Sequence, residues 1–362
     1  MRHRHGSRDP IPWMTMWVGG KHGGSIDLMA MSTIEIKKAI LHGAGDLRIE
    51  SEPFALDSLE ADQVLVRTIA SGFSTGTDLA NYLGRSTELP GAPGYPRAVG
   101  YSNAGVVWKA GSAVRGFKEG DAVFSIKTHR SAFVTAESEL LVPVPAGLDP
   151  APVSLAYLAN LGVASLRAVH YQAGERIAVV GLGVIGLCTV ALGRAMGASV
   201  IAIANDVSRA ALARRLGARP DFGGEGADIV VLTANTWEAY RSAVDIARHG
   251  GRISVLGFPG RGQGPPQFNP LDPQWFYGKQ LTLSAAGFAP RIECGPSDIR
   301  FNLRRNLTSI FEWMASGTLD LAPIISHRIP FHRMQEAYEL ALGHSKELTA
   351  AVFDWTSAHE AV

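Results

Sequence analysis

Cysteine is nearly missing from this chain of 362 residues, in which only Cys188 and Cys294 occur. The two lie far apart in the sequence and in no spacing typical of metal ligands. This excludes a disulfide framework and a cysteine-rich zinc lobe. Such sparse use of cysteine is typical of a reducing compartment, so we expect a cytoplasmic protein.

An excess of charge of one sign and long hydrophobic runs are missing as well. The 34 Lys and Arg residues nearly balance the 33 Asp and Glu residues, which leaves a formal net charge of +1. That charge provides no long-range attraction to nucleic acid or acidic membranes. No apolar run approaches the roughly 20 residues of a membrane-spanning helix. We therefore expect a small-molecule substrate, and neither nucleic acid nor a membrane as a partner.

The patterning changes along the chain, whose 362 residues are enough for about two domains. Residues 1–32, rich in His, Gly and Arg, contain no run long enough for the core of a signal peptide, and we predict a disordered extension. Residues 33–152 carry short strand patterns closed by Gly or Pro, which predict a β-rich, barrel-like domain. Residues 153–289 alternate strand and helix signals, which predict a parallel, doubly wound sheet and an α/β fold. Residues 290–362 predict two helices and two strands.

The segment ERIAVVGLGVIGLCTVALGRAMG carries the strongest motif, a GxGxxG at the point where a buried strand turns into a helix. Gly181 permits the tight turn, Gly183 lets the backbone approach a pyrophosphate, and Gly186 lets the helix pack on the strand. Val184 and Ile185 begin the helix, whose free amides and positive dipole end face the phosphates. An ordinary glycine turn is the alternative, but the strand, helix and second strand have the spacing of a dinucleotide site.

The end of the second strand, SVIAIA, indicates which dinucleotide binds. An acidic residue there holds the adenosine ribose of NAD, and its usual position is occupied by Ala204, followed by Asn205 and Asp206. Without the acid a 2′-phosphate meets no repulsion, and Ser208 and Arg209 can approach it. We therefore expect NAD(P) as the cofactor, with a slight preference for NADP. The alternative is that Asp206 reaches back to the ribose and that Arg209 is a solvated helix residue.

Several separated motifs occur in a fixed order: GTD at 76–78, GDAVF at 120–124, GLGVIG, GRISVLGF, FYGKQLTL and the terminal AAVFDW. Through them the chain from about Ile34 resembles the medium-chain dehydrogenase/reductase superfamily, the zinc-type alcohol dehydrogenase-like proteins. The resemblance implies a GroES-like β-barrel catalytic domain, a Rossmann domain that binds NAD(P), and a C-terminal segment that returns to the first domain. It also implies that Gly257 and Phe258 line the cofactor site, and that a homodimer forms through the edge strand LTLSAAG.

Zinc-dependent members of this superfamily hold a catalytic metal with a cysteine, a His-Glu pair and a further Glu or Cys. The matching positions here are Thr75, Tyr101 with Ser102, and Asn160. Neutral Thr, Tyr and Asn are poor zinc ligands, so we expect no zinc. Zinc-free branches of the superfamily include quinone and enoyl reductases. The STGT at 74–77 is also similar to the bacteriochlorophyllide dehydrogenase group, but it does not fix a substrate.

Without a metal, hydrogen-bond donors have to polarise the substrate oxygen. Tyr101 is the first candidate donor, with a packed aromatic ring as the alternative. Thr77 matches the hydroxyl that relays protons in relatives, and Ser74 orients substrate or caps a turn. His129 lies where relatives line the substrate cleft, although an exposed loop position is the preferred interpretation. Asp78 is expected to accept hydrogen bonds within the turn.

The sequence thus predicts a zinc-independent NAD(P)(H)-dependent oxidoreductase that transfers hydride to or from a small carbonyl, alcohol or activated double bond. The alternative from another functional class is a nucleotide-binding sensor or structural protein without turnover. Both functions use the same fold, because function depends on the site.

Overall fold

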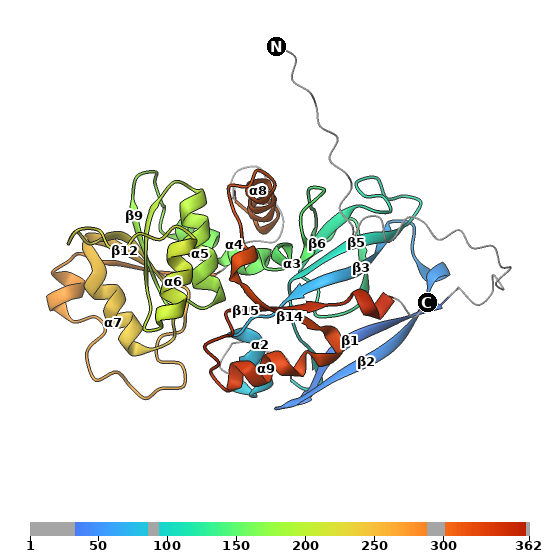
Figure 1. Cartoon of the computed structure of the whole chain (residues 1–362), viewed down its shortest axis with the longest axis horizontal. Coiled ribbons are helices and arrows are strands. Elements are labelled where there is room, and N and C mark those ends of the chain that lie inside the picture. Colours follow the sequence, from blue (N-terminus) through green and yellow to red (C-terminus); the bar gives the residue numbers. More distant parts are fainter. Residues whose placement is uncertain (1–32, 86–93, 288–300, 360–362) are drawn as a thin grey trace, which may run out of the picture.

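The computed structural model describes residues 33–85, 94–287 and 301–359, and the extension predicted for residues 1–32 lies outside these ranges. The strands form three sheets, of three, five and seven strands. Figure 1 shows the five-stranded sheet on one side of the molecule and the other two sheets on the opposite side, with helix α4 (Ala156–Ala168) between them. The predicted α/β architecture, a β-barrel domain followed by a Rossmann domain, is confirmed.

The first domain is built around one central strand. Its strands are β1 (Thr33–Gly43), β2 (Asp46–Ala55), β3 (Gln63–Gly72), β4 (Arg97–Ala98), β5 (Asn103–Ala110), β6 (Ala122–Ser125), β7 (Ala132–Ala136) and β8 (Leu141–Pro143), and its short helices are α2 (Thr77–Tyr82) and α3 (Pro150–Val153). β3 pairs antiparallel with both β5 and β7. Its residues Val64, Leu65 and Val66 are completely buried, because both faces of this strand are covered.

The C-terminal segment returns to the first domain. Helix α8 (Leu303–Ala315) ends before Gly317, which has the positive φ of +73° that favours glycine. β14 (Ile325–Pro330) leads through α9 (Gln335–Leu342) to β15 (Ala350–Asp354), which pairs parallel with β14 and antiparallel with β3. The last strand therefore extends the sheet of the first domain. Single-turn elements complete this description: η1 (Leu56–Ser58), the π-helical η3 (Pro273–Tyr277), η4 (Ala322–Ile324), η5 (Phe331–Arg333) and η6 (Thr356–His359).

The five-stranded sheet is parallel throughout. Its strands are β9 (Arg176–Val180), β10 (Ser199–Ile203), β11 (Ala227–Leu232), β12 (Ala247–Val255) and β13 (Thr282–Ala285), and its helices are α5 (Val184–Ala195), α6 (Val207–Arg215) and α7 (Trp237–Ile246). The strand order is β10-β9-β11-β12-β13. Beyond β10, where a doubly wound sheet has a further strand, the chain makes one isolated bridge between Ile201 and Arg219. This order places the glycine loop after β9 at the topological switch point, where such sheets bind nucleotides.

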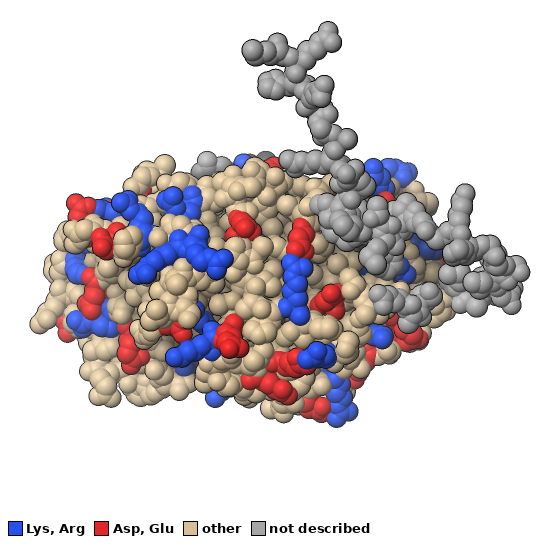
Figure 2. All heavy atoms as spheres, in the orientation of Figure 1, with Lys and Arg blue, Asp and Glu red and all other residues tan. Residues whose placement is uncertain are grey.

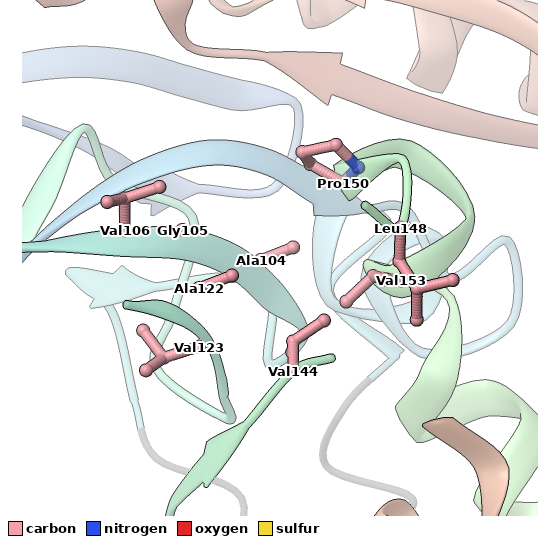
Figure 3. Close-up of a pocket in the computed structure, with 9 residues that line it drawn as sticks. All are labelled: Ala104, Gly105, Val106, Ala122, Val123, Val144, Leu148, Pro150 and Val153. Carbon is pink, nitrogen blue, oxygen red and sulfur yellow. The ribbon is translucent and has the colours of Figure 1, made fainter. Parts of the chain in front are cut away.

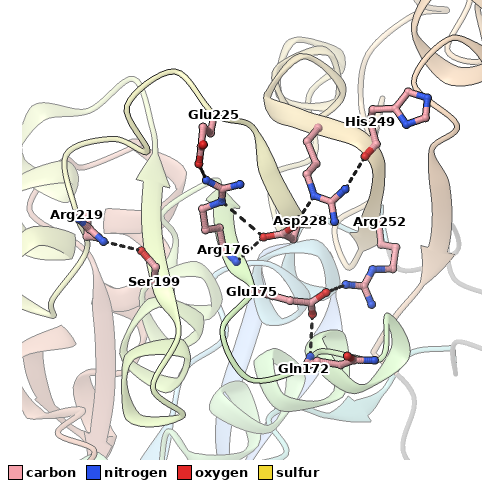
Figure 4. A network of polar contacts seen from close by, with 10 residues as sticks. Gln172, Glu175, Arg176, Ser199, Arg219, Glu225, Asp228, His249 and Arg252 are labelled. Carbon is pink, nitrogen blue, oxygen red and sulfur yellow. Dashed lines mark hydrogen bonds and ion pairs between the residues drawn. The ribbon is translucent and has the colours of Figure 1, made fainter.

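Polar side chains tie the starts of these parallel strands together, at the edge opposite the glycine loop (Figure 4). Asp228, near the start of β11, accepts a hydrogen bond from the Arg176 amide at 2.8 Å and pairs with Arg248. Arg252 of β12 pairs with Glu175. Because these contacts fix the amino ends of the strands, the loops at their carboxyl ends are left for binding.

The surface carries no large region of one charge on the face drawn in Figure 2, where Lys and Arg side chains are interspersed with Asp and Glu. This distribution agrees with the nearly balanced net charge of +1. In the described ranges, no helix has the length and apolar character needed to span a membrane.

Candidate active site and cofactor site

The glycine loop between β9 and α5 has the three properties that a dinucleotide site requires. Gly181 has a φ of +96°, and a Cβ on it would lie 2.7 Å from the Ala234 amide nitrogen. A Cβ on Gly186 would collide with the carbonyl oxygen of Gly181. A Cβ on Gly183, in contrast, would meet nothing within 4 Å. Protein contacts therefore require the first and third glycines, whereas the second borders open space that a pyrophosphate can occupy.

Helix α5 begins at this open space. Gly183 is its N-cap, and Val184 and Ile185 form its first turn. The amides of a first helical turn have no intrahelical acceptor, and the helix dipole makes this end positive. The loop and the helix together fit the pyrophosphate of NAD(P), at the position that the sequence predicts.

The carboxylate of Asp206 is committed to helix α6. It caps the helix by accepting a hydrogen bond from the Arg209 amide at 2.9 Å. This bond, with a further one from the Ser208 amide, lowers the pKa of Asp206. Asn205 and Ser208 are exposed, whereas Ala204 is partly buried at the end of β10. The carboxylate therefore has a structural partner that competes with any role at the ribose.

Arg209 is not the solvated helix residue of the alternative interpretation. Its guanidinium donates to the carbonyl of Leu182 in the glycine loop at 3.1 Å and to the carbonyl of Leu348 in the C-terminal segment at 3.0 Å. Lys346, from the same segment, is close enough to contribute to the lowered pKa of Asp206. Two cations from different domains therefore flank the end of β10.

The loops after β11 and β12 lie beside the glycine loop. Thr233 donates from Oγ1 to the Gly181 carbonyl at 2.8 Å, and Asn235 accepts from the Phe258 amide at 2.8 Å. A Cβ on Gly257 would collide with the backbone of the β11 loop, and Phe258 is 49% exposed. Sequence analysis missed Thr233 and Asn235. Their place directly after a parallel strand next to β9 was the available signal.

Three of the four predicted catalytic residues come together around one phenol. The side chains of Ser74 and Thr77 lie beside the hydroxyl of Tyr101, and their hydrogen bonding lowers its pKa. Burial raises the pKa of Tyr101, and the charge of Asp78 raises it further, while the two hydroxyls lower it by less. The ring packs edge-on against Tyr157, with 4.9 Å between centroids. At neutral pH the phenol is therefore protonated and is able to donate a hydrogen bond.

Asp78 holds the two segments that carry this cluster. Its side chain is completely buried. Oδ2 accepts from the Ser74 amide at 2.9 Å, and Oδ1 accepts from the Gly100 amide at 3.1 Å. The expected structural role of Asp78 is confirmed, and its carboxylate keeps Ser74 close to Tyr101, the residue that follows Gly100.

His129 lies elsewhere than predicted. Its side chain is 0% exposed, so the preferred interpretation of an exposed loop residue is wrong. Nδ1 lies 2.8 Å from Ser71 Oγ, Nε2 lies 3.7 Å from Asp78 Oδ2, and the ring packs edge-on against Phe353. The loop turns inward because the His129 backbone bonds to β1 and to the segment after β4. His129 therefore packs beside Asp78, has its hydrogen bond with Ser71, and does not join the cluster around Tyr101.

Ser102 and Asn160, at two of the family's zinc-ligand positions, have other partners. Ser102 donates to the Ser154 carbonyl at 2.5 Å, and Asn160, which is 2% exposed, accepts from Asn306 at 2.8 Å. Thr75 is partly buried. No group of three or more His, Cys, Asp and Glu residues gathers in the part of the chain that the structure describes. A set of neutral oxygen donors does not fit a catalytic zinc ion.

Tyr157 is a further member of the site that sequence analysis missed. It lies on α4 three residues before Asn160. Residues at this spacing share one helix face, so the face that packs against Tyr101 also carries Asn160. The spacing was visible in the sequence, but the direction of the face was not.

A small pocket elsewhere in the first domain carries none of this chemistry. It is lined by residues of β5, β6 and the chain around α3, which Figure 3 labels: Ala104, Gly105, Val106, Ala122, Val123, Val144, Leu148, Pro150 and Val153. All nine are apolar, and none is a predicted site residue. The pocket is therefore not a candidate for binding the substrate oxygen.

Comparisons with known proteins identify relatives of both domains. Residues 60–146 match the alcohol dehydrogenase GroES-like domain, and residues 184–294 match the family called zinc-binding dehydrogenase. Sorbitol dehydrogenase of Bacillus subtilis is 23% identical, covering 86% of this chain and 95% of that protein. L-threonine 3-dehydrogenase of Bacillus velezensis is 26% identical, covering 84% and 95%.

A solved structure agrees with these relatives in fold. It is that of a putative zinc-binding dehydrogenase from Sinorhizobium meliloti bound to NADP, which superposes with a TM-score of 0.69 at 21% sequence identity. The match covers 89% of this chain and 99% of that one. Two domain models in the family's order, and relatives along most of the chain, show that this protein belongs to the medium-chain dehydrogenases/reductases, which use NAD(P).

Proposed function

We propose that this protein is a zinc-independent NAD(P)(H)-dependent oxidoreductase that transfers hydride to or from a small carbonyl, alcohol or activated double bond. The observation that carries the proposal is the placement of Tyr101, which packs against Tyr157 beside Ser74 and Thr77, where the family's zinc enzymes have a metal ligand. When bound, NAD(P) supplies or accepts the hydride. The protein has to orient the two reactants and stabilise the charge that develops on the substrate oxygen.

The cluster around Tyr101 is suited to that task in the direction of carbonyl reduction. Ser74 and Thr77 lower the pKa of Tyr101, and we assign them as donors to its oxygen, because donation to the oxygen favours the ionised form. Its own proton is then free to point at the substrate oxygen. After the phenol gives up this proton, the two hydroxyls stabilise the phenolate, and Thr77 is the more accessible of the two for passing a proton back from solvent.

The absence of zinc is part of this proposal. Tyr101 and Asn160 are engaged by neutral partners, and neither presents a thiolate or imidazole. Zinc binds such ligands poorly. We therefore assign the polarisation of the substrate to hydrogen bonds alone.

We also infer a preference for NADP over NAD. Ala204 contributes no negative charge at the end of β10, and Asp206 is engaged as a helix cap. Arg209 and Lys346 supply positive charge beside it. A 2′-phosphate placed there meets attraction rather than repulsion.

A homodimer in the cytoplasm completes the proposal. Among the described residues β13 is the last strand of the five-stranded sheet, and we infer that its outer edge pairs with the same strand of a second copy. Light scattering of the purified protein checks this: we expect the mass of a dimer, and the mass of a monomer would contradict it.

The test of the proposed function begins with the protein lacking residues 1–32, titrated with NADPH and with NADH. The tighter complex is then screened for turnover of ketones, quinones and enones. Gly183→Val is the control, because its side chain enters the space left open at this position and should abolish cofactor binding without disturbing a protein contact. Turnover of one substrate class supports the proposal. Tight binding of the cofactor without turnover of any class would favour the nucleotide sensor instead.

A further inference from the structure

A line of three polar side chains leads from the outside of helices α4 and α8 to the site. Arg167, near the end of α4, donates to Asn306 Oδ1, and Asn306 Nδ2 donates to Asn160 Oδ1 at 2.8 Å. Asn306 is 1% exposed and Asn160 is 2% exposed. The contact between the two amides is therefore buried between the helices, which pack against each other beside the domain interface (Figure 1).

The arginine fixes which way both amides point. An amide side chain has one accepting and one donating end, whereas a guanidinium only donates. Asn306 must therefore present its oxygen to Arg167, which leaves its nitrogen facing Asn160. Asn160 must in turn present its oxygen to Asn306, so its own nitrogen is directed away from this line. The orientation of Asn160 thus follows from hydrogen-bond polarity along the chain of contacts.

The Asn160 nitrogen points away from Asn306, and Asn160 shares one face of α4 with Tyr157. Within the described residues Asn160 Nδ2 forms no hydrogen bond with a protein group. It is also not one of the fully buried polar atoms that lack a partner, so it is not sealed from solvent. Tyr157, one helical turn earlier on the same face, packs against Tyr101. The amide thus lies one helical turn from the ring that contacts the phenol, and both groups are donors.

Arg167 also provides positive charge at the outer end of the line. Its guanidinium stacks on the ring of Phe301 at 3.5 Å, which holds it in place. Burial, with help from the charge of Arg305, lowers the pKa of Arg167 to about 10, so it remains charged at neutral pH. Hydrogen bonds in a chain polarise one another, so the positive charge of Arg167 makes the Asn160 amide a stronger donor.

We propose that Asn160 contacts the substrate, donating a hydrogen bond from Nδ2 to the same oxygen that Tyr101 meets, and that Asn306 and Arg167 are positioning residues that fix this donor. The inference rests on the proposed function. No proton leaves the amide; it stabilises negative charge on the oxygen while Tyr101 supplies the proton. A guanidinium two amides away thereby takes over part of the electrostatic role of a metal.

Asn306→Asp tests the orientation with almost no change in shape. The new carboxylate pairs with Arg167 and can only accept, so Asn160 has to turn its nitrogen toward position 306 and its oxygen toward the substrate. We expect kcat to fall on the order of a hundredfold with little change in KM, and NADPH affinity and melting temperature to be nearly unchanged. Asn302→Asp is the matched control, because it makes the same exchange in the N-cap of the same helix, where Asp caps equally well, and should leave kcat unchanged.

Two further measurements keep the inference open to refutation. A neutron structure of the free, deuterated wild-type protein should place the Nδ2 deuterons of Asn160 away from Asn306, and the opposite arrangement would overturn the inference whether or not a substrate is known. If Asn306→Asp does not fold, Asn160→Asp should show the same loss of kcat, because the carboxylate oxygen facing the substrate cannot donate and repels the negative charge that develops there. An unchanged kcat in this variant would also overturn the inference. A wild-type protein that turns over no carbonyl compound would refute the proposed function, while the neutron structure would still decide the orientation.

Discussion

Replacing Tyr101 by Phe removes one hydroxyl and leaves the ring in place against Tyr157, at 4.9 Å between centroids. Ser74 and Thr77 lose their shared partner, which should cost about 1–2 kcal/mol of unfolding free energy at ~1 kcal/mol per hydrogen bond. The transition state should lose more. An oxyanion donor contributes about 2.7–4 kcal/mol to it, equivalent to a factor of roughly 10² to 10³ in kcat.

The assay is carbonyl reduction at saturating NADPH, with kcat and KM measured separately. We expect kcat to fall on the order of a hundredfold while KM and cofactor affinity stay nearly constant, because the hydroxyl acts in the transition state. Tyr82→Phe is the matched control. The Tyr82 hydroxyl accepts from Gln335 at 2.6 Å, so its loss should reduce stability and spare turnover. An unchanged kcat in Tyr101→Phe would refute the reasoning and make this tyrosine structural.

The remaining predictions concern the cofactor, the glycine loop and pH. Ala204→Asp should shift preference toward NADH by about tenfold, ~1.4 kcal/mol, in paired titrations; a wild type that already strongly prefers NADH would contradict this. Gly186→Ala should lower the melting temperature because its Cβ collides with backbone, whereas Gly183→Ala should leave it unchanged and weaken cofactor binding; equal melting temperatures would be the contrary result. His359 donates to the Thr68 carbonyl at 2.8 Å, and burial lowers the pKa of this histidine to about 4. In the unfolded chain this histidine is protonated below pH ~6.5, whereas in the folded protein it stays neutral down to about pH 4. The free energy of unfolding should therefore have its full value above pH ~6.5 and fall by up to about 3 kcal/mol toward pH 4. His359→Gln should flatten this dependence on pH in denaturant titrations, and an unaltered dependence would argue against it.

The parts of the fold that were predicted correctly depend on residues that are close together in the sequence. The strand, glycine turn and helix around Gly181 are adjacent in sequence, so the residue types that permit the turn are visible without the structure. The same holds for the end of α8 before Gly317. Asp206 as a helix cap was also accessible to sequence analysis, since an acidic residue directly before a helical pattern favours that role.

The features that sequence analysis missed depend on contacts between segments far apart in the sequence. His129 is buried because Phe353, from the last strand, packs against its ring and Asp78 lies behind it; a loop sequence contains no sign of either neighbour. Tyr157 enters the site because of the direction in which α4 faces Tyr101. Helical periodicity gives the spacing of a face but not its partner, so the line from Arg167 to Asn160 was equally hidden.

Hydride transfer without a metal can be tested by measuring turnover and metal content on one sample of the protein. The protein should lack residues 1–32, because His3 and His5 in that segment can bind stray metal, and it should be dialysed against a strong chelator before elemental analysis. We predict far less than one zinc ion per chain and full turnover with NADPH, because in the proposed mechanism hydrogen bonds from Tyr101 and Asn160 polarise the substrate. About one zinc ion per chain, with turnover lost on chelation and restored by added zinc, would contradict it.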